Sequence, residues 1–393
     1  MTDSALSGVR VVELCQMVAG PYCAKILADL GADVIKVEPP GGDASRQRSD
    51  LFLYLNTNKR GITLDPLGHE GARLFHELCR DVDILIEDTP PGTLEDWNIG
   101  FGHLSAVNPR LIVASITPFG QHGPHRDWKA HPITTWFSSG EGYFLPVPTP
   151  DGGPATAREP VQAGGLVGEY RCGMSAAVAI LLALCSQQAT GQGQQIDISK
   201  QEALLDLSRY EICKYPNDGF IERRDTRASP SGGLLPCRDG WVDVHFTEDH
   251  QWRALVQFLG HPEWGEDELF ATRGARAAHR EELVACLAPE LQRYTPEEIY
   301  HGAQRLGCPV GPITDPADLL ASPQLGVRGF FPELEHSDSE RFRQPGVPYQ
   351  FSATPCAVRL PAPRLGEHND AVLGKVFGIT PEELARLRTA GVI

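Results

Sequence analysis

The amino-terminal part of the chain alternates apolar strands with helical stretches, and this alternation constrains the fold more than any other feature. Residues 9–14 form a compact apolar run, Gly20 and Pro21 open a helical pattern, and Gly31 ends it before the apolar run 34–37. The alternation continues with apolar runs at 62–64, 84–86 and 111–114 and a helical stretch at 71–79. Strand–helix–strand units of this kind build parallel sheets covered by helices. The sequence therefore predicts an α/β fold that binds its ligand at the carboxyl edge of the sheet.

The turn after the first strand excludes the common nucleotide cofactors. Residues 15–21 lack the GxGxxG pattern that lets a dinucleotide pyrophosphate lie against a helix start, and the chain contains no GxxxxGK[ST] pattern. We therefore expect no NAD, no flavin and no P-loop nucleotide.

Charge and composition narrow the possible partners. The chain is 41% hydrophobic and 22% charged, with a net charge of −16, so it has the composition of a globular protein and lacks the basic excess of a nucleic-acid-binding protein. The first residues lack a signal-peptide pattern and no apolar run reaches the length of a membrane span, which favours a cytoplasmic protein without membrane contact. Ten cysteines without a CxxC pair predict reduced thiols, and neither they nor the histidines form a metal-binding pattern.

A second, smaller domain is predicted after a break at residues 217–233. Runs at 234–237 and 241–246 flank Asp239 and Gly240 in the manner of a hairpin. Helical stretches follow, one opened by a capping box at residues 295–298, and residues 380–383 repeat that pattern before a short final helix.

A glycine-rich segment at 164–173 surrounds one carboxylate, Glu169, directly before the apolar run 174–185. Glycines leave room for a substrate acyl group, and the start of the following helix stabilises negative charge. Glu169 is therefore a candidate reagent. The alternative is a carboxylate that only stabilises the helix start.

Several stretches together resemble the class III CoA-transferase family, which includes formyl-CoA, carnitine and bile-acid CoA-transferases and the α-methylacyl-CoA racemases. The resemblance covers nearly the whole chain, and the stretches that carry it are 6–14, 19–21, 30–43, 58–65, 190–194, 308–312 and 365–368.

This resemblance implies an interlocked, ring-like homodimer. Each chain would contain a large Rossmann-like CoA-binding domain at 1–220, completed by 335–393, and a smaller α+β domain at 221–334. The substrates would be an acyl-CoA and a carboxylic acid acceptor, with coenzyme A as the group transferred and no metal.

The resemblance also implies a covalent mechanism. Transferases of this family use an aspartate as nucleophile, and Glu169 occupies that position, with an extra methylene group. Its carboxylate would attack the thioester to form a mixed anhydride and then an enzyme-bound CoA thioester. The glycine-rich segment with Ser229, Gly232 and Gly233 resembles the loop that shields this intermediate; the alternative for this segment is a plain interdomain linker.

His131 leaves a second activity open. It stands where transferases usually carry tyrosine and racemases carry a catalytic histidine. His131 and Glu169 could exchange the α-proton of an acyl-CoA, which is racemase or isomerase chemistry. A histidine that only forms hydrogen bonds within the large domain is the alternative, and a third interpretation of the chain is a non-catalytic CoA-binding or partner subunit.

The resemblance assigns the CoA contacts by position. Gln16, Val18 and Ala19 would border the pantetheine and phosphates, Leu64 would pack on the adenine, and Lys129 would approach the thioester. The basic side chains expected near the phosphates are Lys36, Arg46, Lys59 and Arg60. Asp88 and Thr89 stand at CoA-contacting positions where relatives commonly carry asparagine and an aromatic residue, so they add a negative charge near a polyanion.

Overall fold

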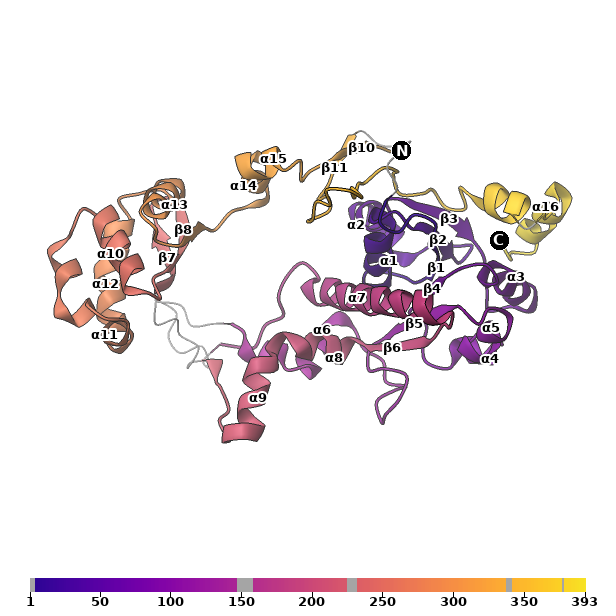
Figure 1. Cartoon of the computed structure of the whole chain (residues 1–393), viewed down its shortest axis with the longest axis horizontal. Coiled ribbons are helices and arrows are strands. Elements are labelled where there is room, and N and C mark those ends of the chain that lie inside the picture. The colour runs from indigo at the N-terminus through magenta and orange to yellow at the C-terminus, as the bar shows by residue number, and fades with distance from the viewer. Residues whose placement is uncertain (1–3, 147–157, 225–231, 337–340, 377) are drawn as a thin grey trace. The chain divides into compact units, whose positions relative to one another are not determined.

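The chain forms two compact units, which are described separately. The structure is a computed structural model that describes residues 4–146, 158–224, 232–336, 341–376 and 378–393 (Figure 1). Unit 1 comprises Met1–Glu141, Gln162–Arg209 and Pro323–Ile393, and unit 2 comprises Gly142–Val161 and Tyr210–Ser322. These divisions precede the predicted domain borders at 220 and 335, which remain predictions.

Unit 1 contains a six-stranded parallel sheet with strand order β3-β2-β1-β4-β5-β6. Its strands are β1 (Arg10–Leu14), β2 (Asp33–Glu38), β3 (Lys59–Thr63), β4 (Ile84–Glu87), β5 (Ile112–Thr117) and β6 (Gln195–Ser199). The predicted α/β fold with a parallel sheet is confirmed. The chain reverses its direction of winding between the neighbouring strands β1 and β4, and sheets of this type bind ligands at that point.

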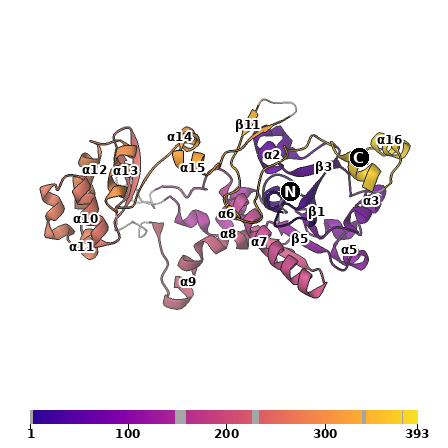
Figure 2. The same ribbon diagram turned by 45° about the horizontal axis from the view of Figure 1, so that its top comes forward.

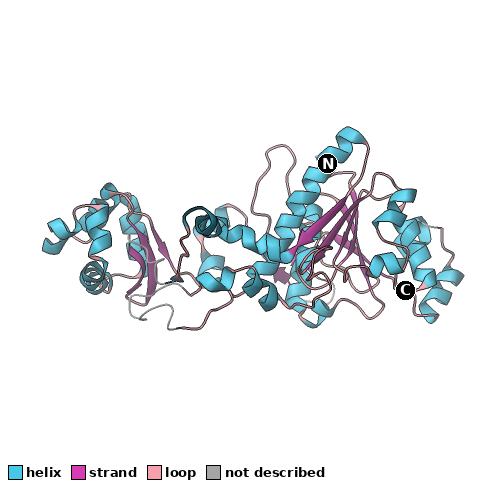
Figure 3. Cartoon of the chain, turned by 90° about the horizontal axis from the view of Figure 1, so that it is seen from below, coloured by secondary structure: helices cyan, strands magenta, loops and turns pink. Residues whose placement is uncertain are grey.

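Helices lie on both faces of this sheet (Figure 3). The helices of unit 1 are α1 (Ala19–Asp29), α2 (Ser49–Leu55), α3 (His69–Cys79), α4 (Thr93–Asp96), α5 (Phe101–Val107), α6 (Pro132–Ser138), α7 (Val167–Thr190), α8 (Lys200–Leu205), α15 (Pro323–Val327) and α16 (Pro381–Thr389). The antiparallel strands β10 (Glu333–Glu335) and β11 (Arg341–Arg343) also belong to unit 1. The short segments η1 (Ala44–Gln47), η4 (Asp206–Ser208) and the π-helical η8 (Asp370–Val376) complete it.

The carboxyl-terminal tail completes the core of unit 1. Leu384 and Leu387 of α16 are buried in the same cluster as Val12 of β1 and Phe75 of α3. Helix α16 lies beside α3 in two views (Figures 1 and 2), and Arg386 pairs with Glu70 across them. The predicted final helix is therefore confirmed, and its Thr380 cap accepts from the Glu383 N–H.

Unit 2 combines a small antiparallel sheet with helices. The strands β7 (Gly232–Cys237), β8 (Gly240–His245) and β9 (Val310–Pro312) pair in that order, so the predicted hairpin is confirmed. The helices are α9 (Arg209–Asp218), which begins at the unit border, α10 (Asp249–Phe258), α11 (Arg273–Ala278), α12 (Arg280–Leu291), α13 (Pro296–Arg305) and α14 (Pro316–Ala321), with short η2 (Glu141–Phe144), η6 (Glu263–Glu266) and η7 (Glu268–Phe270). The predicted capping box of α13 is present, because Thr295 and Glu298 each accept the other's N–H.

Candidate active site

A pocket of about 550 Å³ opens in unit 1 where β1 and β4 end. Its wall includes the segment Cys15–Val18 after β1, Asp88 and Thr89 after β4, and Lys200 directly after β6. Its volume falls within the range of small-molecule sites, roughly 300–1,000 Å³. The pocket therefore lies at the edge of the sheet that the sequence predicts for ligand binding.

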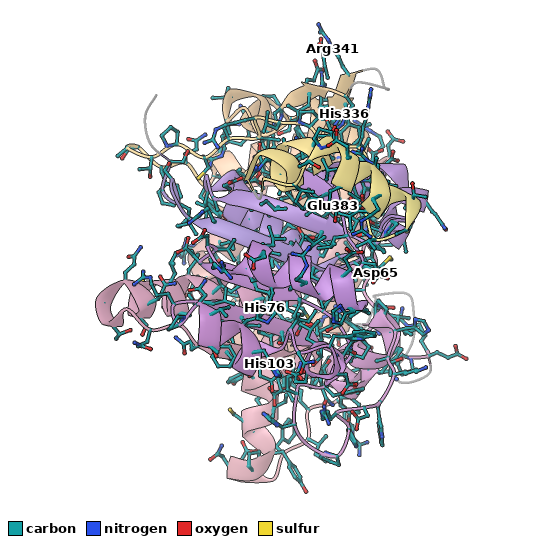
Figure 4. All side chains as sticks on the ribbon, turned by 90° about the vertical axis from the view of Figure 1, so that its right-hand side faces the viewer. Asp65, His76, His103, His336, Arg341 and Glu383 are labelled. Carbon is teal, nitrogen blue, oxygen red and sulfur yellow. The ribbon has the colours of Figure 1, made fainter. Side chains whose placement is uncertain are left out.

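The carboxyl-terminal tail supports the part of the pocket wall that contains Asp65. Asp65 lines the pocket, and its backbone N–H donates to the Val392 carbonyl at 2.8 Å. Figure 4 shows Asp65 near α16, which carries Glu383. The position of this wall therefore depends on a contact with residues more than three hundred positions later.

Glu169 enters the pocket from the first turn of α7. Leu166 precedes the helix in the left-handed conformation (φ 58°), and its carbonyl accepts the Glu169 N–H at 2.9 Å. Only 5% of Glu169 is exposed. Close packing of α7 on α1 requires a glycine at position 173, since a Cβ there would lie 2.5 Å from the Ala19 carbonyl oxygen. From the sequence, Glu169 was expected before the apolar run. In the structure the helix already begins at Val167, so Glu169 lies inside it.

Lys200 is the partner of Glu169, and the sequence analysis missed it. Its Nζ lies 2.7 Å from Glu169 Oε2, and the two side chains are 18% and 6% exposed. Burial lowers the pKa of Lys200, but the charges of Glu169 and Asp88 outweigh burial, so its pKa lies above the ordinary value. Lys200 directly follows a strand of the parallel sheet. Ligands bind at the carboxyl ends of such strands, so this position could have indicated Lys200 from the sequence.

Asp88 adds a second carboxylate to the pocket. Both of its oxygens accept the Gln16 backbone N–H, at 3.0 and 3.2 Å. Burial raises the pKa of Asp88 to about 7, although Lys200 and the hydrogen bond from Gln16 oppose this. Asp88 therefore changes charge near neutral pH, in direct contact with the loop after β1.

The loop after β1 is also held from inside the protein by a cluster of buried charges. Lys36 Nζ donates to the Cys15 carbonyl at 3.0 Å and pairs with Glu13 and Asp43 at 3.0 and 2.9 Å. Asp43 also accepts the N–H of Met17, a residue with φ 63°. Burial lowers the pKa of Lys36, but Glu13 and Asp43 raise it more. The cluster therefore holds a left-handed residue in place on the pocket wall.

The buried cluster bears on two of the predicted phosphate contacts. Lys36 and Lys59 are 0% and 1% exposed, and Lys59 pairs with the same Glu13 at 2.7 Å. Burial lowers the pKa of Lys59 to about 8 despite Glu13. In these positions neither lysine can reach a phosphate in solvent, because their ammonium groups are enclosed and satisfied by protein atoms.

The two arginines predicted for the phosphates are nearer the surface. Arg46 donates to both oxygens of Glu38 at 2.7 Å and lies 3.8 Å from the centre of the Phe52 ring. Arg60 pairs with Asp33 at 2.6 Å. A phosphate contact by either one would compete with its carboxylate, and it stays a prediction.

The remaining predicted CoA contacts divide between the pocket and its surroundings. Those that line the pocket are Gln16, Val18, Asp88 and Thr89. Ala19 begins α1 beside it and is buried, whereas Leu64 is enclosed in the core of unit 1, which leaves no surface for an adenine. Lys129 is exposed and lies outside the lining.

His131 also lines the pocket and is exposed there. It precedes α6, and its backbone N–H donates to Thr134 Oγ1 at 3.2 Å. The structure thus brings His131 and Glu169 to one pocket.

The predicted shielding loop is only partly described. Ser229 lies outside the described residues, while Gly232 and Gly233 belong to strand β7, opposite His245 and Val244. Both have positive φ (102° and 104°), and a Cβ on Gly232 would lie 2.2 Å from the Val244 carbonyl oxygen. These two glycines are therefore part of a strand, and the prediction that they belong to a loop is wrong. The close approach of Val244 requires glycine at 232, and the positive φ favours glycine at both positions.

Comparison with known proteins decides the family. The profile described as CoA-transferase family III matches residues 6–369. The chain belongs to this family. It is 35% identical to a succinyl-CoA–D-citramalate CoA-transferase of Chloroflexus aurantiacus, with 99% of this chain and 98% of the relative aligned. It is 31% identical to the beta subunit of a succinyl-CoA–L-malate CoA-transferase of the same organism, with 100% and 99% aligned.

Solved structures agree with this assignment. The crystal structure of a CaiB/BaiF family protein from Brucella suis superposes with a TM-score of 0.84 at 30% identity and covers 95% of this chain and 100% of the other. The parallel sheet and its surrounding helices are therefore shared with this family.

Two further features of the described residues concern metals and membranes. They contain no group of three or more histidine, cysteine, aspartate and glutamate side chains arranged to hold a metal ion. Within them, α7 alone is long and apolar enough to cross a membrane, with a mean hydropathy of 1.5 over an 18-residue window. This is weak evidence, because a core helix has the same length and composition, and α7 packs against α1 and β5.

Proposed function

We propose that this chain transfers CoA between an acyl-CoA and a carboxylic acid, with Glu169 as the covalent nucleophile. The carboxylate attacks the thioester carbon, the C–S bond breaks, and the electron pair leaves with the CoA thiolate. The thiolate then attacks the Glu169 carbonyl carbon and releases the donor acid, which leaves an enzyme-bound CoA thioester. An acceptor acid reverses the two steps.

The observation that carries this proposal is the position of Glu169. It is 5% exposed, lies in the first turn of a 24-residue helix, lines the pocket and pairs with Lys200. The helix start and the ammonium of Lys200 both stabilise negative charge at this position.

We base the proposed substrate class on the relatives. Both relatives from Chloroflexus aurantiacus are described as acting from succinyl-CoA onto a hydroxy dicarboxylic acid, D-citramalate or L-malate. We extend the proposal to a short dicarboxylic acyl-CoA as donor and a dicarboxylic acid as acceptor.

The proposal also includes the interlocked homodimer. Light scattering across a dilution series tests the oligomeric state, and a monomer at low concentration would contradict the homodimer.

The test of the covalent step is mass spectrometry after incubation with succinyl-CoA. We expect a succinyl or CoA adduct on the peptide that contains Glu169, and hydroxylamine should convert it to a hydroxamate. Glu169→Gln is the matched control and should carry no adduct. CoA binding without any adduct in the wild type would favour a non-catalytic subunit instead.

A second candidate function has one observation in its favour: His131 and Glu169 line the same pocket. A racemase would exchange the α-hydrogen of a 2-methylacyl-CoA with solvent, using both groups. Proton NMR in heavy water measures that exchange. Rapid exchange that is lost in His131→Tyr would establish this activity in place of transfer.

A further inference from the structure

The charge on Glu169 changes during the proposed cycle, and Lys200 is the paired group that must respond. In the resting enzyme the two form an ion pair at 2.7 Å inside the pocket. Once the CoA thiolate has attacked the glutamyl carbonyl, Glu169 is a neutral thioester and its former charge leaves with the donor acid. Lys200 then loses the carboxylate that it held.

Lys200 keeps the charge of Asp88 nearby but has lost its larger anionic partner, Glu169. Its side chain is 18% exposed, and burial strengthens its attraction to an anion, since the effective dielectric constant is lower than in water. It also stands at the first position of α8, where a helix start disfavours positive charge. Among the described residues that line the pocket, the only other basic side chain is His131.

The incoming acid supplies the missing charge at the right stage. We propose that Lys200 changes partners during the reaction: it binds the Glu169 carboxylate in the resting enzyme and the carboxylate of the acceptor acid once Glu169 carries CoA. This inference rests on the proposed function. It gives Lys200 direct contact with a substrate.

The remaining steps balance in charge and bonds. The acceptor carboxylate attacks the glutamyl thioester carbon, the C–S bond breaks, and CoA leaves as the thiolate. The thiolate attacks the acyl carbon of the acceptor in the resulting anhydride, which forms the product thioester and releases Glu169 as a carboxylate. One negative charge enters with the acceptor and returns to Glu169, which pairs with Lys200 again.

Glu169→Gln provides a direct test without turnover, because its neutral amide copies the charge of the thioester state. Succinate serves as the probe, and isothermal titration calorimetry in the presence of CoA measures its Kd. We expect Glu169→Gln to bind succinate about tenfold or more tightly than the wild type, as a charge-assisted hydrogen bond of roughly 1.5–3 kcal/mol predicts. Glu169→Gln with Lys200→Met should lose this gain.

A second lysine–glutamate pair supplies the control. Lys214 pairs with Glu222 in unit 2, so Glu169→Gln with Lys214→Met should keep the gain in succinate affinity. Equal affinities of the wild type and Glu169→Gln, or a gain that survives Lys200→Met, would overturn the inference. Circular dichroism melting of each variant confirms that the measured protein is folded.

The failure of this inference and the failure of the proposed function give different results. An adduct on Glu169 without a gain in succinate affinity supports the covalent route and removes the role of Lys200. A gain without an adduct establishes Lys200 as a carboxylate site and removes the covalent route.

Discussion

Two groups of charged side chains lie close to the same pocket and behave differently. The inner group, Glu13, Lys36, Asp43 and Lys59, is at most 2% exposed and joined by ion pairs of 2.7–3.0 Å. The outer pair, Glu169 and Lys200, faces the pocket. In the inner group every charge has a protein partner, so it stabilises a loop. The outer pair lines the pocket, and we propose that a substrate replaces one of its partners during the reaction.

The largest effect should come from the outer pair. Glu169→Gln keeps the shape of the side chain but removes the nucleophile, so CoA transfer should fall by about a thousandfold or more while the melting temperature changes little. Following transfer from succinyl-CoA to malate by chromatography measures it. Transfer at a rate near that of the wild type would remove Glu169 from the mechanism.

The inner group should show the opposite pattern, with a large loss of stability. Lys36→Met leaves Glu13 and Asp43 buried with one cation fewer, which should cost about 3–5 kcal/mol of the free energy of unfolding. Urea denaturation measures this loss, and Lys200→Met, which is partly exposed, is the matched comparison with a smaller loss. Equal losses of unfolding free energy in the two variants would contradict the distinction between the inner group and the outer pair.

Asp88 lies between the two groups, and its effect should depend on pH. Its pKa is raised from the ordinary 3.8 to about 7, so ionisation penalises the folded state increasingly as pH rises from about 4 to 7. Asp88→Asn removes that penalty. We expect the variant to be roughly 2 kcal/mol more stable than the wild type at pH 8, because the pocket partly solvates the charge, and this advantage should fade towards pH 4. An advantage that grows as pH falls would contradict the assignment.

The smallest effect should be that of His131. If the chain is a transferase, His131 moves no proton, and His131→Tyr should change transfer by less than about tenfold. If it is a racemase, exchange of the α-hydrogen should fall by about a hundredfold or more. The same heavy-water sample can report both rates.

The first strands and helices along the chain, and a candidate carboxylate that lines the pocket, could be predicted from local patterns. Apolar runs and helix caps are properties of adjacent residues, so β1, α1 and β2 were predicted to within a few residues, and the glycines around Glu169 marked it as a reagent. Partners of charged side chains could not be predicted in this way. In the sequence Lys36 resembles a phosphate ligand, but strand pairing places Glu13 beside it. Lys200 resembles a surface lysine in the sequence, but α7 places Glu169 within an ion-pair distance of it.

The glycines at 232 and 233 show a different limit of prediction from sequence. Glycine-rich sequence indicates a loop when only conformational freedom is considered. Here a close backbone approach in β7 requires glycine at 232, and a positive φ favours glycine at 233. The close approach depends on β8, which the sequence pattern predicted without its register.

The contact between Asp65 and Val392 has a consequence for how the protein is made. The six strands of the parallel sheet end at Ser199, but the apolar surface around Phe75 is covered only after Leu384 and Leu387 have been synthesised. The larger segment of unit 2, Tyr210–Ser322, emerges from the ribosome in between. The nascent sheet therefore remains partly uncovered while more than a hundred residues are added. During that interval its exposed apolar surface can bind chaperones or aggregate.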